Sequence, residues 1–415
     1  MKRVDEVYPI DINSTIGPTG TIKRLFRNRS YFAERGYDLH IFANHPIKKG
    51  FLTYQFELRE LNSLPGEKDS EIMTDTINKS KTKSKLKSTL KQFIENHKVL
   101  SAYMLDKKVK GAKKHVEEYL LKDTHADIVV FHESRSCYHY CLLRKDTKAR
   151  VVLFSHDDGS DDGMFLKKRP KLKDSKELKE HYMMRDYCLE HIDRIVFISD
   201  LARQNFCKSH PEYADKAITV LNGIDDKSPV EVQPSSDYRY RLVCTGSVCE
   251  RKGQYIVIEA MHRLSPEVLK DIHFTVIGTG PDHAKLASIV QEYRLQEHVT
   301  LKGNIPNAEV HKMLCSENIY ILMSNNEGLP ISILEAMRAG LPVISTKIAG
   351  IPEEVDDRNG VLINPDIEQL VEVLNDLPNH DWKMLGQNSR KRFEEEFTFE
   401  IMRKNYADIF DSLLN

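Results

Sequence analysis

The alternation of short apolar runs with helix-forming segments is the feature that most constrains the fold of this chain. β-branched runs of strand length recur along the sequence, and a breaker or polar residue follows most of them. They lie at residues 4–12, 37–43, 127–131, 151–155, 194–199 and 217–221, and again at 241–245, 274–277, 299–301, 319–323, 342–345 and 361–363. Continuous apolar strands are typical of parallel sheets that are covered on both faces. The alternation therefore predicts an α/β fold.

The length and composition of the chain predict that this fold is divided into two domains. The chain has 415 residues, and one domain usually takes roughly 100–200. Residues 222–240 are rich in Gly, Pro and Ser, as expected of a linker. We expect an N-terminal domain at 1–230, a C-terminal domain at 231–395 and a terminal helix at 396–415.

Several classes of protein are disfavoured by composition. No apolar run approaches the ~18 residues that span a bilayer, and the N-terminus lacks the apolar segment of a secretory signal. The seven cysteines are scattered and contain no Cys-x-x-Cys pair, which favours a reducing cytoplasm over a disulfide framework. Cys137, His139 and Cys141 follow His132 closely. A metal site there matches no familiar spacing, so we expect thiols packed inside a helix.

Charge is spread unevenly along the chain. Residues 1–230 hold 42 Lys and Arg against 34 Asp and Glu, whereas the remainder holds 19 against 28. The stretch from Lys79 to Lys114 has twelve lysines and only Glu95 and Asp106 as acids. We expect a basic helical insertion at about 50–120. Its lysines would contact an anionic membrane surface or an anionic molecule that serves as the acceptor of a transferred group. The alternative is a solvated helix.

The segment EGLPISILE at residues 327–335 is the strongest functional signal. It follows a predicted strand and opens a helix expected at about 332–339. The N-terminus of a helix exposes unpaired N–H groups that bind anions such as phosphate. Pro330 suits the first helical turn because it has no N–H to leave unpaired. The amides at Gly328, Leu329 and Ile331 are then available to a diphosphate.

Two carboxylates flank this helix start. Glu335 lies one to two turns into the helix, where a carboxylate can accept hydrogen bonds from ribose hydroxyls, as in dinucleotide folds. Glu327 lies in the loop and can bind hydroxyls of a sugar. Two acids that merely flank a surface helix are the alternative for such a pair taken alone.

Further segments carry a resemblance to a known family. GLPVIS at 340–345, AGIPE at 349–353 and NGVL at 359–362 follow the acidic pair in order. Together with EG-x-P and the second Glu, they resemble the retaining glycosyltransferases of family 4, with their E-x7-E motif. The resemblance is dense from about 241 to 364 and sparser before it. It implies the GT-B fold, in which two Rossmann-like domains face each other across a cleft and a C-terminal helix crosses back to the first.

The resemblance also implies roles for basic residues after the first strand of the second domain. Lys252 falls on the lysine that binds the donor diphosphate. The usual arginine position is occupied by Ser247, and Arg251 is expected to supply the second positive charge. Such cations stabilise the departing nucleotide.

Other positions match the family more loosely. Asn304 falls in the segment that meets the nucleobase, and Gly17 and Gly20 fall on the glycine loop that approaches the phosphates. His156 matches the histidine that faces the transferred sugar from the end of a strand. A histidine that only caps its strand is the alternative for His156.

The resemblance therefore implies transfer of a sugar, with retention, from a nucleotide-diphosphate donor, for which we expect UDP. The acceptor would be a glycan, a lipid-linked glycan, a polymer or a protein. No metal, other cofactor or nucleic acid is expected. We expect the protein in the cytoplasm, or peripheral at the inner face of the membrane. A sugar-nucleotide epimerase and a non-catalytic acceptor-binding subunit of a transferase complex are the rival interpretations.

Overall fold

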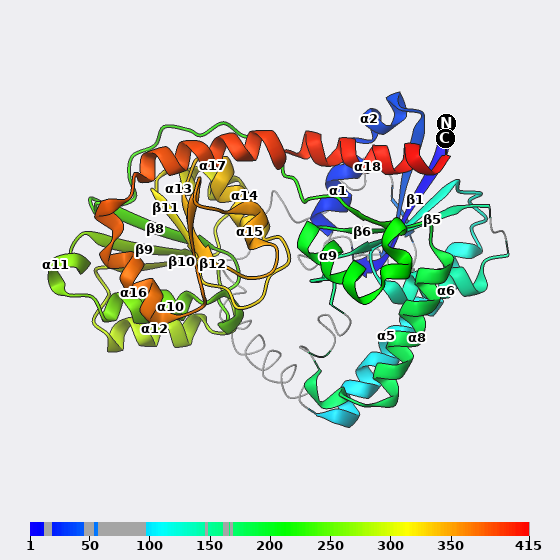
Figure 1. Ribbon diagram of the computed structural model, residues 1–415, viewed down its shortest axis with the longest axis horizontal. Coiled ribbons are helices and arrows are strands. Elements are labelled where there is room, and N and C mark those ends of the chain that lie inside the picture. The colour runs from blue at the N-terminus through cyan, green and yellow to red at the C-terminus, as the bar shows by residue number, and fades with distance from the viewer. Residues whose placement is uncertain are drawn as a thin grey trace, which may run out of the picture. The chain divides into compact units, whose positions relative to one another are not determined.

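The computed structural model describes residues 1–11, 19–44, 54–56, 97–145, 148–160, 166 and 169–414. The chain divides into two compact units. The first combines residues 1–220 with residues 403–415, and the second comprises residues 221–402. Each unit has its own sheet with helices packed on it (Figure 1).

The first unit is built on a seven-stranded sheet of order β3-β2-β1-β4-β5-β6-β7. Every neighbouring pair is parallel except β2 with β3, which is antiparallel. The strands are β1 (Lys2–Asp11), β2 (Tyr37–Asn44), β3 (Tyr54–Gln55), β4 (Ile128–Phe131), β5 (Arg150–Ser155), β6 (Arg194–Phe197) and β7 (Ala217–Thr219). The strands expected from the apolar runs are thus present, and β4 and β5 are buried along nearly their whole length.

Helices cover this sheet in the order that the alternation predicts. They are α1 (Thr19–Arg27), α2 (Arg29–Glu34), α5 (Lys98–Leu120), α6 (Ser134–Leu143), α8 (Lys176–His191) and α9 (Asp200–Ser209). Helices α1 and α2 are separated at Asn28, whose side-chain amide donates to the carbonyl of Arg24 at 2.9 Å. Gly36 follows with φ of +88°, as expected of the residue that ends a helix.

Helix α18 (Phe399–Leu414) provides the last part of the first unit. Its Phe410 ring lies 5.4 Å from Tyr37 and 6.1 Å from Phe32. Arg35 pairs with Asp408 at 2.9 Å and also with Asp411. Aromatic packing and ion pairs therefore fix residues from the end of the sequence onto its first βαβ segment.

The second unit has a six-stranded, wholly parallel sheet of order β10-β9-β8-β11-β12-β13. Its strands are β8 (Tyr240–Thr245), β9 (Ile272–Ile277), β10 (Val299–Gly303), β11 (Ile319–Leu322), β12 (Val343–Thr346) and β13 (Gly360–Ile363). The helices are α10 (Gln254–His262), α11 (Pro266–Leu269), α12 (His283–Glu292), α13 (Asn307–Cys315), α14 (Ile331–Arg338), α15 (Ile351–Glu354), α16 (Ile367–Asn375) and α17 (Trp382–Glu396). Every strand run predicted for this half is present.

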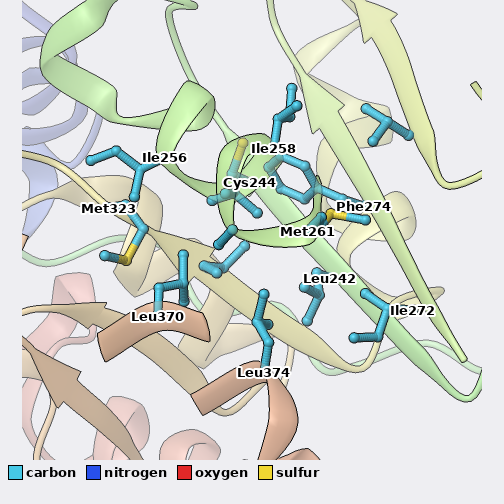
Figure 2. Close-up of a cluster of buried hydrophobic side chains, with 14 of the residues drawn as sticks. Leu242, Cys244, Ile256, Ile258, Met261, Ile272, Phe274, Met323, Leu370 and Leu374 are labelled. Atoms are coloured by element: carbon cyan, nitrogen blue, oxygen red, sulfur yellow. The ribbon is translucent and has the colours of Figure 1, made fainter. Parts of the chain in front are cut away.

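The core of the second unit joins strands β8 and β9 to helices α10 and α16. Figure 2 shows Leu242, Cys244, Ile272 and Phe274 of the strands beside Ile256, Ile258, Met261, Leu370 and Leu374 of the helices. All of these side chains are buried, and burial of a side chain of this size contributes ~1.5–3 kcal/mol. The core fixes β8 in the middle of the sheet, so the loop that leaves β8 starts from a rigid support.

The structure describes only the second part of the basic stretch. Residues 98–114 lie in α5, where the six lysines of this segment are exposed. Lys110 pairs with Asp106 at 2.8 Å, and Lys113 pairs with Glu117 at 3.7 Å. Residues 79–96, with the other six lysines, lie outside the described residues.

Two glycines with left-handed backbones give a matched test of this packing. Gly253 has φ of +67° and Gly303 has φ of +69°. A Cβ at Gly253 would overlap the carbonyl oxygen of Met323, whereas a Cβ at Gly303 would meet nothing within 4 Å. We expect Gly303→Ala to cost ~1–2 kcal/mol for the backbone conformation, and Gly253→Ala to cost clearly more. Thermal unfolding measures both, and equal losses would contradict the packing described for Met323.

Candidate active site

A cluster of charged side chains lies at the ends of β8 and β11. These strands are neighbours in the sheet, and parallel strands bring their carboxyl ends to the same edge. Glu327 Oε1 is 2.7 Å from Arg251 Nη1 and 2.8 Å from Lys252 Nζ. The hydroxyl of Ser324 donates to the same oxygen at 2.8 Å. We refer to Arg251, Lys252, Ser324 and Glu327 as the Glu327 cluster.

Burial differs sharply within the Glu327 cluster. The side chains of Lys252 and Glu327 are 10% and 8% exposed, whereas that of Arg251 is 44% exposed. A buried charge is costly unless it is paired, so Glu327 and Lys252 each stabilise the other in place. Arg251 also donates to the carbonyl of Asn326 at 2.7 Å. The cluster thus holds one fixed cation and one cation that reaches solvent.

A second carboxyl group lies near this cluster. Glu354, the last residue of α15, is fully buried, and neither of its carboxyl oxygens has a hydrogen-bond partner among the described residues. Burial, with a further contribution from the charge of Glu327, raises the pKa of Glu354 well above its ordinary value. Glu354 is therefore held as a neutral acid beside an ionised network.

The loop before α14 presents unpaired backbone groups. Helix α14 begins at Ile331, one residue earlier than expected, and Pro330 is its N-cap instead of part of its first turn. Among the described residues, the N–H groups of Leu329 and Ile331 have no hydrogen-bond acceptor. The carbonyls of Gly328 and Leu329 accept hydrogen bonds from Gly350 N at 2.9 Å and Asn222 Nδ2 at 3.4 Å. These bonds fix the loop while its amides stay available.

The remaining candidate donor residues occupy loops or a helix of their own unit. Glu335 is half-buried in α14, one turn after Ile331. Ser247 and Asn304 are exposed in the loops after β8 and β10, and the carbonyl of Ser247 accepts a hydrogen bond from Gln254 at 3.2 Å. In the first unit, Gly20 is exposed near the start of α1. Gly17 lies outside the described residues.

His156 belongs to a second group of polar residues, which lies wholly in the first unit. It follows β5, and its Nε2 is 3.0 Å from Nδ1 of His132, which follows β4. The other ring nitrogen of His132, Nε2, is 2.8 Å from Oε2 of Glu6 on β1. Burial and the neighbouring His132 lower the pKa of His156 to about 3. His156 is therefore a neutral imidazole at physiological pH.

A cavity of about 340 Å³ opens beside this histidine. Its lining includes His132, His156, Asp157, Arg135, His181 and Arg185. Arg135 pairs with Glu133 at 2.9 Å, and Arg185 pairs with Asp186 at 2.8 Å. Burial raises the pKa of Asp157. The wall of the cavity thus carries several polar and positively charged side chains.

Cys137, His139 and Cys141 are buried in α6, as expected for packed side chains. Cys137 and Cys141 belong to the hydrophobic core of the first unit, and burial lowers the pKa of His139. Among the described residues, no group of three or more His, Cys, Asp or Glu side chains could hold a metal ion. No helix within the described ranges is long and apolar enough to cross a bilayer.

Sequence reasoning missed Glu6 and Glu354. Glu6 stands beside Asp5 inside the first predicted strand, where both acids are buried, and two acids within a buried strand were the available signal. The partner of Glu6, His132, lies 126 residues away. Glu354 stands beside Glu353, and the amino-acid sequence alone does not show which of the two side chains is buried.

Comparison with known proteins places these features in context. Residues 230–396 match the family model for glycosyl transferases group 1. One component of the phosphatidylinositol N-acetylglucosaminyltransferase of Arabidopsis thaliana is 26% identical over 233 residues, which cover 55% of this chain and 51% of the relative. The putative colanic acid biosynthesis glycosyltransferase WcaL of Escherichia coli is 26% identical over 183 residues, with 41% and 45% covered. These matches support a glycosyltransferase family.

The chain spans about half the length of the curated relatives that it matches. Solved structures resemble it over its whole length. HepE of Anabaena, crystallised with UDP, has a TM-score of 0.64 at 16% identity and covers 99% of this chain and 100% of its own. Sucrose-phosphate synthase of Thermosynechococcus elongatus has a TM-score of 0.67 at 16% identity, covering 100% and 99%. The expected two-domain α/β fold of the GT-B type is confirmed.

The buried neutral acid gives a pH-dependent prediction. A raised folded-state pKa means that Glu354 favours folding only below its unfolded pKa, near 4.5, and costs stability as the pH rises above that value. We expect Glu354→Gln, which cannot ionise, to stabilise the protein by about 1 kcal/mol or more at about pH 8, where one unit of pKa shift is worth ~1.4 kcal/mol. This gain in stability from Glu354→Gln should vanish below about pH 4.

The measurement is thermal unfolding of both proteins across this pH range. Glu372→Gln, on the exposed side of α16, is the matched control and should change little. A Glu354→Gln protein that is less stable than wild type at about pH 8 would mean that Glu354 is ionised and paired in the fold.

Proposed function

We propose that this protein is a retaining glycosyltransferase of family 4, which transfers a sugar from a UDP-sugar to a carbohydrate-containing acceptor. The observation that carries the proposal is the Glu327 cluster beside the unpaired amides at the start of α14. Two cations and a helix N-terminus form a binding site for a diphosphate. Names of relatives that are glycosyltransferases, and a structural neighbour with bound UDP, point the same way.

Each residue has a role in the proposed donor complex. Lys252 and Arg251 bind the diphosphate and stabilise the charge that develops on it as the bond to the sugar breaks. The amides of Leu329 and Ile331 face the same group. Glu327, already fixed by Ser324 and Lys252, accepts hydrogen bonds from sugar hydroxyls.

The nucleoside end of the donor meets other residues. Glu335 binds the ribose hydroxyls, and Asn304 lies beside the base. The phosphates are approached by backbone or small side-chain groups of Gly20, Gly328 and Ser247. No metal enters this scheme, because fixed cations and amides supply the positive charge.

Retention follows in this proposal from attack on the face that the diphosphate leaves. The departing diphosphate accepts the proton of the attacking hydroxyl, so the protein contributes positioning and charge stabilisation. His156 contacts the sugar from the first unit. A neutral imidazole suits this role because it can exchange hydrogen bonds with hydroxyl groups without adding charge.

A non-catalytic role in binding the acceptor for a transferase complex is the second candidate. It is favoured by Ser247, an exposed neutral residue at the position where the family has arginine. A purified chain that releases no nucleotide from any donor, with or without acceptor, would support this second role over the first. A donor panel with mass detection of nucleotide release makes the distinction.

We propose that the acceptor is a glycan, a lipid-linked glycan or another polymer at the inner face of the membrane. Relatives named for phosphatidylinositol, colanic acid and amylovoran support this range. The exposed lysines of α5 would attract such an anionic surface, with each lysine near it contributing ~1 kcal/mol.

Substitutions in the donor site test the proposed chemistry. We expect Lys252→Ala and Glu335→Ala each to lower the rate of transfer by ~10²–10³, the usual cost of losing one charge-stabilising group. Lys270→Ala and Glu292→Ala remove the same charges from exposed positions in the same unit and should leave the rate unchanged. Rates of nucleotide release are measured for all four proteins, with circular dichroism as the check on folding. Near-normal turnover of Lys252→Ala would rule out this donor site.

The lysines of α5 test the proposed anionic surface. The test variant replaces four lysines together by Gln: Lys107, Lys110, Lys113 and Lys114. We expect its binding to vesicles that contain anionic lipid to be weaker than that of wild type by roughly 100-fold or more at low salt, since each lysine contributes ~1 kcal/mol. The control replaces four exposed lysines of the second unit, Lys270, Lys312, Lys383 and Lys391. Sedimentation with vesicles gives the binding. Equal binding by both variants and wild type would show that α5 is only a solvated helix.

A further inference from the structure

Glu6, His132 and His156 form a continuous chain of hydrogen bonds, and the proposed donor chemistry uses only its last member, His156. The chain starts on β1 and ends at the cavity beside His156, with steps of 2.8 Å and 3.0 Å. The side chains of Glu6 and His132 are 0% and 1% exposed. Water therefore does not compete for these two bonds, and the three groups must satisfy one another.

The order of donors along this chain follows from elementary chemistry. An ionised carboxylate only accepts hydrogen bonds, so Nε2 of His132 carries a hydrogen and donates to Glu6. With His132 as a neutral imidazole, which has one N–H and one lone pair, its Nδ1 accepts. His156 then donates from its Nε2. Its Nδ1 is left without hydrogen, as a lone-pair acceptor.

Aromatic side chains pack against the ring of His132. Phe154 stacks on His132 at 5.2 Å, and Tyr8 meets the same ring edge-on at 5.8 Å. The ring of Tyr406, from α18, stacks on Phe154 at 4.6 Å. Burial, with a further contribution from the charge of the neighbouring Glu6, raises the pKa of the Tyr406 hydroxyl. The ring of His132 is thus held by aromatic neighbours from β1 and β5, and α18 supports Phe154.

We propose that Glu6 and His132 are positioning residues that present His156 to the bound sugar as a hydrogen-bond acceptor at Nδ1. Among the described residues, this nitrogen has no hydrogen-bond partner, and the His156 ring lines the cavity. A hydroxyl group of the sugar or of the acceptor is the chemical class of ligand that would donate to it. The inference rests on the proposed function only for the identity of that ligand.

The hydrogen-bond order itself is measured without activity, by nitrogen NMR of the whole protein labelled at histidine. The His156 signal is identified by its loss in His156→Asn. At about pH 8, we expect hydrogen on Nε2 of His156 and a bare Nδ1. His298 provides the opposite reference in the same spectrum, because its Nδ1 lies 3.0 Å from the carbonyl oxygen of Ile272 and must donate to it. A hydrogen on Nδ1 of His156 would overturn the proposal.

Variants of Glu6 separate positioning from mere stability. Glu6→Met removes the acceptor, and we expect the His156 signal to show both tautomers. Glu6→Gln keeps a carbonyl that can accept from His132 and should restore the wild-type signal. Circular dichroism and thermal unfolding check the fold of both variants, because His298 belongs to the other unit. A single Nε2–H form of His156 in Glu6→Met would show that Glu6 does not set the tautomer.

Kinetics then connect this arrangement to the proposed reaction. With the most active donor of the panel, kcat should fall by at least about ten-fold in Glu6→Met, because a wrong histidine tautomer disrupts catalysis. KM for the donor should stay within about two-fold of wild type. If the tautomer of His156 changed but kcat did not, the positioning role would be overturned. If the wild-type protein showed no turnover, the proposed function would be refuted, whereas the NMR result would still stand.

Discussion

The carboxylate of Glu327 is the point on which the candidate donor site depends. One of its oxygens accepts hydrogen bonds from Lys252, Arg251 and Ser324. Lys252 could not remain nearly buried without such a partner, because an isolated charge would be expelled to water or neutralised. The site is therefore assembled before any ligand arrives, and binding requires only that its cations share their charge. Preorganised charge of this kind is what stabilises a transition state most effectively.

The two units use the same edge of a parallel sheet in different ways. In the second unit, adjacent strand ends carry opposite charges, which attract one another into a compact pair. In the first, they carry two imidazoles that are bonded to each other and to a carboxylate inside the sheet. The strand ends of the second unit supply charge, whereas those of the first unit supply a neutral group of fixed orientation. The proposed sugar transfer would draw on both, since one end of the donor is anionic and the other presents only hydroxyl groups.

The sequence predicted the fold well because strand and helix signals are local. Continuous runs such as residues 319–323 and 342–345 needed only their neighbours to be read as buried strands. The unpaired amides of Leu329 and Ile331 were also predictable, because Pro330 and the strand-loop-helix order fix them locally. The Glu6–His132 bond was not, since it joins residues 126 positions apart. Nor was the burial of Glu354 in preference to Glu353, which depends on how a four-residue helix docks.

The stacking of Tyr406 on Phe154 has a consequence for how the chain is made. The first unit takes its last pieces, residues 403–415, from beyond the whole of the second unit. A ribosome that has finished residue 220 has produced a sheet whose face over Phe154 and Phe32 is still open to water. Domains usually fold as units in the order of synthesis, so here the second unit can finish first. The first unit must then keep an incomplete apolar surface soluble until Tyr406 and Phe410 emerge, which is the interval in which a chaperone would be of most use.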